Sequence, residues 1–137
     1  MKSLLYVILC VSAIQMHSQT RESLNCDGLT ELPIKASVVL NAHAQNEFIK
    51  KRELLTYDFH LVLSDTTFKI IAFVVGYDRH SASLLDINSR TYLGNTIEAG
   101  DPFITHIWLG DLLVIDCINV EKNGKRYLLK GLQFKIY

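Results

Sequence analysis

The stretch from Gly110 to Tyr137 constrains the fold of this chain more than any other part of its sequence. It contains an apolar run from Leu112 to Val120, the pair Asn123-Gly124, and a second run that begins at Lys125. Asn-Gly is the strongest two-residue signal for a β-hairpin, because both residues tolerate positive φ. The pattern therefore predicts a strand, a tight turn and a returning strand to about residue 130.

The chain ends in a further strand. Gly131 interrupts the returning strand, and the residues after it alternate between apolar and polar types. Alternation with a period of two is typical of a strand with one buried face. It predicts that Leu132, Phe134 and Ile136 face the core while Gln133 and Lys135 face water.

Three upstream segments also have β patterns. Residues 36–42, which follow Pro33, and residues 57–63 alternate between apolar and polar side chains, which predicts two half-buried strands. Residues 68–75 are apolar at nearly every position, which predicts a central strand covered on both faces and ended by Gly76. Residues 77–100 are rich in Ser, Asn, Asp and Gly, and predict an irregular connection with room for one edge strand.

A short helix is expected near residues 101–109. Asp101 can cap the free N–H groups of a first turn, and Pro102 suits the first helical position. Apolar residues recur at four-residue spacing, with Ile104 and Trp108 as one such pair, and Gly110 supplies a left-handed stop. The whole chain is therefore predicted to be mainly β, a small antiparallel β-sandwich or curled sheet with one short helix. An immunoglobulin-like arrangement is one form of that class.

The first residues resemble a secretory signal. Lys2 precedes an apolar run from Leu4 to Ile14, which is about half of the roughly 20 residues that a membrane-spanning helix needs. We expect residues 1–18 to be removed, residues 19–31 to form a polar tether, and residues 32–137 to form a single β domain. A buried N-terminal helix is the alternative, which the lack of a polar face disfavours. No membrane span is expected after cleavage.

Charge excludes some partners. The chain has 14 basic and 14 acidic residues, so loss of Lys2 leaves 13 against 14 and a net charge of −1. Such a balance gives no electrostatic basis for binding nucleic acid or an anionic membrane. The run Lys50-Lys51-Arg52 is followed at once by Glu53 and is interpreted as a solvated loop or the start of a strand.

Two cysteines, Cys26 and Cys117, remain after the signal. Export permits a disulfide between them. It would close a loop of about 92 residues and contribute roughly 4–5 kcal/mol in the chain-entropy model. Alternatively, Cys117 is a free thiol that acts as a small hydrophobe in an apolar strand. The sequence leaves both possibilities open.

No catalytic, cofactor-binding or metal-binding residues are predicted. The four histidines that follow the signal, His43, His60, His80 and His106, have no partner at metal-ligand spacing. Asp58 lies two residues from His60, on the same face of a predicted strand. A structural surface pair is the first interpretation, and a catalytic base with its orienting carboxylate is the second. The segment from Asp78 to Ser83 is interpreted as a polar turn.

Several segments resemble the C-terminal domain of the gliding-motility and type IX secretion protein GldM. They are Ile49 to Leu54, Phe68 to Phe73, Gly110-Asp111, and the ending from Ile118 to Ile136. The match spans about residues 48–137. It implies a periplasmic β domain from a Bacteroidota-type bacterium. Members of that family carry a transmembrane anchor and several periplasmic domains, whereas here a cleavable signal leads into one domain, so a motor function is not implied.

These observations predict an exported, non-catalytic interaction or structural module of the bacterial cell envelope, periplasmic or secreted. Its partner would be another envelope protein, bound through an exposed edge strand or loop tips. Residues 77–95 are the candidate partner-facing segment, with a passive connection as the alternative. A functional alternative is a small secreted hydrolase or inhibitor-like domain that uses Asp58 and His60.

Overall fold

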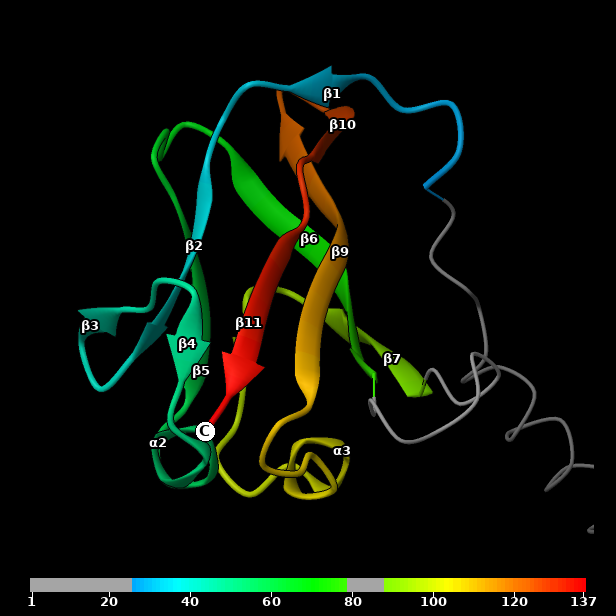
Figure 1. Ribbon diagram of the computed structural model, residues 1–137. Coiled ribbons are helices and arrows are strands. Elements are labelled where there is room, and N and C mark those ends of the chain that lie inside the picture. The colour runs from blue at the N-terminus through cyan, green and yellow to red at the C-terminus, as the bar shows by residue number, and fades with distance from the viewer. Residues whose placement is uncertain (1–25, 79–87) are drawn as a thin grey trace, which may run out of the picture.

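The computed structural model describes residues 26–78 and 88–137, which form two β-sheets (Figure 1). Buried apolar side chains from both sheets make one hydrophobic core. The first sheet contains β1 (Glu31–Leu32), β4 (Phe48–Ile49), β6 (Lys69–Asp78), β7 (Asn88–Leu93), β9 (Leu112–Lys122), β10 (Lys125–Leu129) and β11 (Leu132–Ile136). The second contains β2 (Ala36–Leu40), β3 (His43–Ala44), β5 (Phe59–Leu63) and β8 (Thr96–Ile97). The prediction of a mainly β, sandwich-like fold is confirmed.

Strand β9 organises the first sheet. One of its edges pairs with β6. Its other edge pairs with β10 from Ile118 onward and with β11 up to Ile115. The change of neighbour takes place at Cys117, whose φ of 50° is unusual for a strand residue. Close to it, the register between β9 and β6 shifts between Ala72 and Val74, so the strand bends where it changes partner.

The C-terminal predictions are confirmed in detail. Asn123 and Gly124 have φ values of 52° and 75°, as a tight hairpin turn between β9 and β10 requires. In β11 the apolar positions face inward, with Phe134 and Ile136 buried, and the polar positions are exposed. The sheet is mixed rather than wholly antiparallel, because the short strands β1 and β4 run parallel to β10 and β11.

Several strand boundaries differ from the prediction. Strand β5 begins at Phe59 rather than at residue 57, and β9 continues to Lys122 rather than ending at Val120. Strand β6 does not end at Gly76, because Gly76 is paired on both sides, with Ser89 of β7 and Val114 of β9. Strand β2 ends at Leu40 rather than at residue 42. Asn41 and Ala42 have φ values of 49° and 61° and form the turn into β3.

The predicted helix near residues 101–109 is a single turn, α3 (Pro102–Thr105). It ends early because the carboxylate of Asp111 accepts the N–H of Trp108 at 2.7 Å, which turns the chain out of the helix. A second helix, α2 (Lys51–Thr56), replaces the predicted loop or strand start. It buries Leu54 in the core.

The end of the predicted tether belongs to the fold. Residues Glu31 and Leu32 form β1, and the N–H of Leu128 donates to the carbonyl of Thr30 at 2.9 Å. The predicted signal, residues 1–18, and the first part of the tether lie outside the described residues. In the portions that are described, no helix has the length and apolarity needed to cross a membrane.

Candidate functional site

Four large apolar side chains are exposed at one end of the molecule. Phe48, Trp108, Leu109 and Tyr137 have exposed fractions of 54%, 58%, 68% and 56%. We call these four residues the apolar end. They come from three separate places in the sequence: β4, the loop after α3, and the C-terminus.

Backbone hydrogen bonds bring these places together. Phe48 is paired with Lys135 in the ladder between β4 and β11, and the N–H of Tyr137 donates to the carbonyl of Ile49 at 3.1 Å. The loop that carries Trp108 joins them through Gly110, whose N–H donates to Ile136 at 2.8 Å. In Figure 1 this end lies at the bottom, where α2, α3 and the C-terminus are grouped.

Strand alternation explains why two of these rings face outward. Ile49 and Ile136 are fully buried, and their neighbours Phe48 and Tyr137 therefore point to the opposite face of the sheet. The two exposed rings meet edge to face with their centroids 6.1 Å apart. Together with Lys135 they line an open hollow of about 420 Å³. These two rings are thus held by backbone pairing with the sheet.

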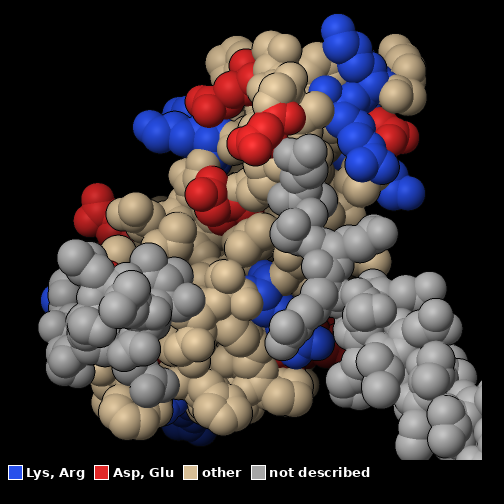
Figure 2. All heavy atoms as spheres, turned by 90° about the vertical axis from the view of Figure 1, so that its right-hand side faces the viewer, with Lys and Arg blue, Asp and Glu red and all other residues tan. Residues whose placement is uncertain are grey.

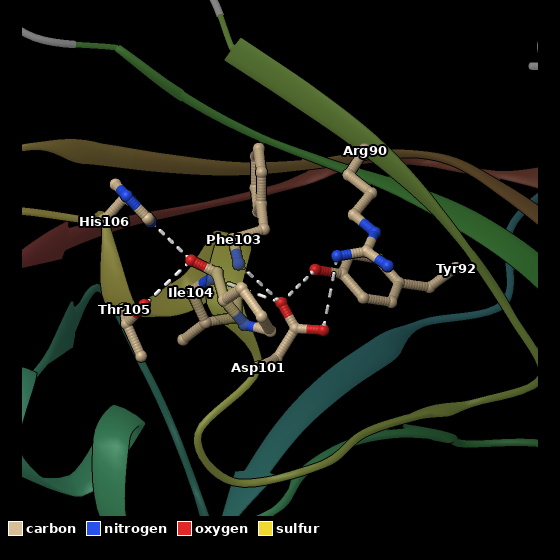
Figure 3. A network of polar contacts seen from close by, with 8 residues as sticks. Arg90, Tyr92, Asp101, Phe103, Ile104, Thr105 and His106 are labelled. Carbon is tan, nitrogen blue, oxygen red and sulfur yellow. Dashed lines mark hydrogen bonds and ion pairs between the residues drawn. The ribbon is translucent and has the colours of Figure 1, made fainter.

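A carboxylate network fixes α3, which leads into the loop of Trp108 and Leu109 (Figure 3). Oδ1 of Asp101 accepts the N–H groups of Phe103 and Ile104 at 2.9 and 3.3 Å and caps the helix. The same oxygen accepts the hydroxyl of Tyr92 at 2.9 Å, and Oδ2 lies 3.7 Å from the guanidinium of Arg90. The network ties β7 to α3.

Burial of Tyr92 and its hydrogen bond to Asp101 raise the pKa of the phenol above its usual value of 10.0. The hydroxyl therefore stays protonated and remains a donor. At the end of α3, Thr105 donates to the carbonyl of Pro102 at 2.8 Å, and Nδ1 of His106 contacts the same oxygen. Asp111, only 4% exposed, holds the N–H of Trp108. The loop is therefore braced on both sides of the two exposed side chains.

Charged residues are concentrated away from this end on the face that Figure 2 shows. Most of the Lys, Arg, Asp and Glu side chains visible there lie in its upper half, toward the β9–β10 hairpin, with both signs intermixed. Lys122 and Lys125 of that hairpin lie over the rings of Phe68 and Tyr127 at 4.8 and 5.4 Å. The mixture of signs gives no large field of one sign on this face.

Asp58 and His60 each form a hydrogen bond with a different partner. Oδ1 of Asp58 accepts the N–H of Ala99 at 2.8 Å, and Nδ1 of His60 lies 3.0 Å from Oγ1 of Thr96. Asp58, directly before β5, and His60, within β5, therefore both link this part of the chain to the segment that contains β8.

The remaining candidates are dispersed. His43 is exposed in β3, and His106 contacts the carbonyl of Pro102. His80, Ser81 and Ser83 lie outside the described residues, so the predicted polar turn is not tested there. Over residues 26–78 and 88–137, no three His, Cys, Asp or Glu side chains are grouped so that they could hold a metal ion.

The structure joins Cys26 and Cys117 in a disulfide, with their Cα atoms 5.7 Å apart. Cys117 is largely buried at the bend of β9. Asp116 accepts the N–H of Cys117 at 2.7 Å. The bridge therefore attaches the N-terminal segment to the point at which the first sheet changes its strand pairing.

The predicted partner-facing segment, residues 77–95, divides into different environments. Tyr77 and Tyr92 are buried and pack on Phe103, whereas Leu93 is 81% exposed. The ends of this segment, residues 77–78 and 88–93, are part of the sheet, and residues 79–87 lie outside the described residues. The sequence does not indicate the apolar end, because the four-residue spacing of Ile104 and Trp108 is typical of one apolar helix face. The signal that could have revealed it is the pair Trp108-Leu109 directly before a Gly-Asp turn.

No protein-family model, no curated protein and no solved structure matches this chain. The resemblance to the C-terminal domain of GldM therefore stays a prediction from the sequence.

Proposed function

We propose that this chain is an exported, non-catalytic protein-interaction module of the bacterial cell envelope, and that it binds another envelope protein through the apolar end. The observation that carries the proposal is the grouping of Phe48, Trp108, Leu109 and Tyr137 at one braced end, each more than half exposed. Large apolar side chains that are exposed close together on a domain surface typically mark an interaction site.

The residue types favour a protein partner. Aromatic side chains are enriched among the residues that contribute most to binding energy, and Trp and Tyr lead that group. Two of the four residues are held by a strand ladder and two by a loop that Asp101 and Asp111 brace. Because the backbone that carries these side chains is already held, ordering it on binding costs less conformational entropy.

The envelope location rests on two supports. The pattern of residues 1–18 is that of a secretory signal. The bridge between Cys26 and Cys117 fits an oxidising compartment, in which disulfides form and persist. Components of gliding motility or type IX secretion are the partners that the resemblance to GldM implies.

In-cell cross-linking followed by affinity purification of the tagged protein from its native organism tests the interaction. We expect the wild type to recover one or two envelope proteins in near-stoichiometric amount. The double variant Trp108→Ser/Leu109→Ser should reduce that recovery at least ~10-fold, the loss expected from removing contacts worth ~1.4 kcal/mol or more. Val62→Ser is the matched control, because Val62 is 42% exposed on the second sheet.

Two outcomes contradict the proposal. Equal recovery of the same partners by the double variant would show that the apolar end does not bind them. Recovery of background proteins alone by the wild type would show that the chain does not bind an envelope protein. Circular dichroism of the purified variants establishes beforehand that they are folded.

Export is tested separately by N-terminal sequencing of the protein from the periplasm or medium. We expect the mature chain to begin at Gln19. A chain that starts at Met1 and is found in the cytoplasm contradicts this part of the proposal without affecting the apolar end.

A further inference from the structure

Strand β7 is an edge strand with a long unpaired side. Its residues Asn88 to Leu93 pair with β6 over six positions, and in the described part of the chain no strand pairs with the opposite side. In Figure 1 it lies at the right-hand margin of the first sheet. An edge of this length presents a row of backbone donors and acceptors to any strand that can reach it.

The direction of these backbone groups follows from one hydrogen bond. Leu93 is paired with Ala72, and the next N–H, that of Gly94, donates to the carbonyl of Ile71 at 2.7 Å. In an antiparallel ladder this geometry makes the Leu93 pair a non-hydrogen-bonded one, and the pattern alternates from there. The backbone groups that point away from β6 therefore belong to Ser89, Thr91 and Leu93.

Within Asn88 to Leu93, this edge lacks several of the features that usually prevent strand addition. Natural edge strands often carry Lys, Pro or a bulge. Strand β7 contains no Lys or Pro, and its register with β6 is regular. Its one charged side chain, Arg90, is held 3.7 Å from Asp101 and 5.4 Å from the ring of Tyr92. Leu93, at the end of the strand, is 81% exposed.

We propose that β7 pairs antiparallel with β7 of a second copy of this chain, in the register that places Thr91 opposite Thr91. Ser89 of each copy then lies opposite Leu93 of the other. The outward backbone groups of these positions form about six hydrogen bonds across the two-fold axis. The two seven-stranded sheets become one continuous sheet.

Charge and strand length select this register among those with the same hydrogen-bond pattern. A register centred on Arg90 places two guanidinium groups directly opposite one another, which is destabilising. One centred on Tyr92 shortens the ladder, because the chain leaves the strand at Gly94. The register centred on Thr91 gives a favourable Thr–Thr pair and places each Arg90 opposite Tyr92 of the other copy rather than opposite the other Arg90.

This inference does not depend on the proposed function, since β7 contains none of the four residues of the apolar end. A chain that binds no envelope protein can still dimerise through β7, and a monomeric chain can still bind through the apolar end.

Single cysteines introduced into the mature, disulfide-bonded protein test the register. Thr91→Cys should form a covalent dimer under mild oxidation, because directly opposite Cα atoms lie ~5.5 Å apart, within disulfide range. Ser89→Cys is the matched control. Two copies of Ser89 would be ~13 Å apart, four residues along the strand, and should not cross-link. A mixture of Ser89→Cys and Leu93→Cys should cross-link.

Charge variants at the same position provide a second test by sedimentation velocity over a concentration series. Thr91→Lys alone and Thr91→Glu alone should each weaken the dimer at least ~10-fold through like charges on the axis, and an equimolar mixture should restore it. Val62→Lys and Val62→Glu, on the other sheet, should leave dimerisation unchanged.

Three results overturn the proposal. The first is a wild-type chain that sediments as a monomer at every concentration. The second is cross-linking of Ser89→Cys as efficient as that of Thr91→Cys. The third is a dimer that the Thr91 charge variants do not weaken while circular dichroism shows them folded.

Discussion

The hydroxyl of Tyr92 donates a 2.9 Å hydrogen bond to the Oδ1 atom of Asp101, the oxygen that also caps helix α3. One carboxylate thus satisfies a buried phenol and the free N–H groups at a helix start. Replacing Asp101 with Ala removes both functions. We expect the free energy of unfolding to fall by about 2–4 kcal/mol, combining a lost cap with an unsatisfied buried donor. Urea unfolding of the purified domain measures it.

Asp101→Asn is the control for this prediction. Its side-chain carbonyl can still accept from Phe103 and Tyr92, so we expect less than half the loss of the Ala variant. If both variants lose the same free energy, the charge near Arg90 is the important element and the cap is not.

Alkaline pH should weaken the fold through Tyr92. Burial raises the pKa of its phenol above 10.0, and the hydrogen bond to Asp101 adds to that shift. Because the folded pKa exceeds the unfolded one, the contribution of this group is fully present below pH 10 and is lost as the pH rises further. The urea midpoint of the wild type should therefore fall more steeply above pH 10 than that of Tyr92→Phe. Parallel curves for the two proteins would contradict the role of Tyr92.

The predictable parts of this fold are those in which the information is local. Asn123-Gly124 specifies a tight turn by its tolerance of positive φ, and the alternation from Leu132 to Ile136 specifies a face. Both signals need no partner elsewhere in the chain. The sandwich-like class follows from adding such strands together.

The errors arise where a distant group decides the local structure. Helix α2 starts at Lys51, whose N–H donates to the carbonyl of Tyr137 at 2.8 Å, a partner 86 positions away by residue number (137 − 51). Trp108 has the four-residue spacing of a buried helix face, but the carboxylate of Asp111 captures its N–H and turns it outward. The apolar end combines both effects, so neither its residues nor their grouping could be read from periodicity.

Gly131 is required where the first sheet turns. A Cβ at this position would lie 2.8 Å from the carbonyl oxygen of Ile115 and 3.3 Å from Oδ1 of Asp116. The first of these is a backbone atom of β9, which cannot shift without disturbing the strand pairing. We expect Gly131→Ala to lower the free energy of unfolding by about 1–3 kcal/mol through overpacking. Lys130→Ala, at the exposed neighbouring residue, should change it by less than ~0.5 kcal/mol. Thermal and urea unfolding compare both variants with the wild type. If Gly131→Ala is as stable as the wild type, the backbone around Gly131 can adjust to the added methyl group.

The bridge between Cys26 and Cys117 closes a loop with a sequence separation of 91 residues. Because such a crosslink restricts the unfolded chain, its loss should cost about 4–5 kcal/mol in the chain-entropy model. Cys26→Ser is the cleaner variant, since Cys117 is buried at a positive φ and its replacement would also disturb the bend of β9. We expect Cys26→Ser and the reduced wild type to unfold at similar, lower urea concentrations than the oxidised wild type. If reduction leaves the midpoint of the wild type unchanged, the bridge does not contribute to stability, and β1 must be held by its pairing with β10 alone.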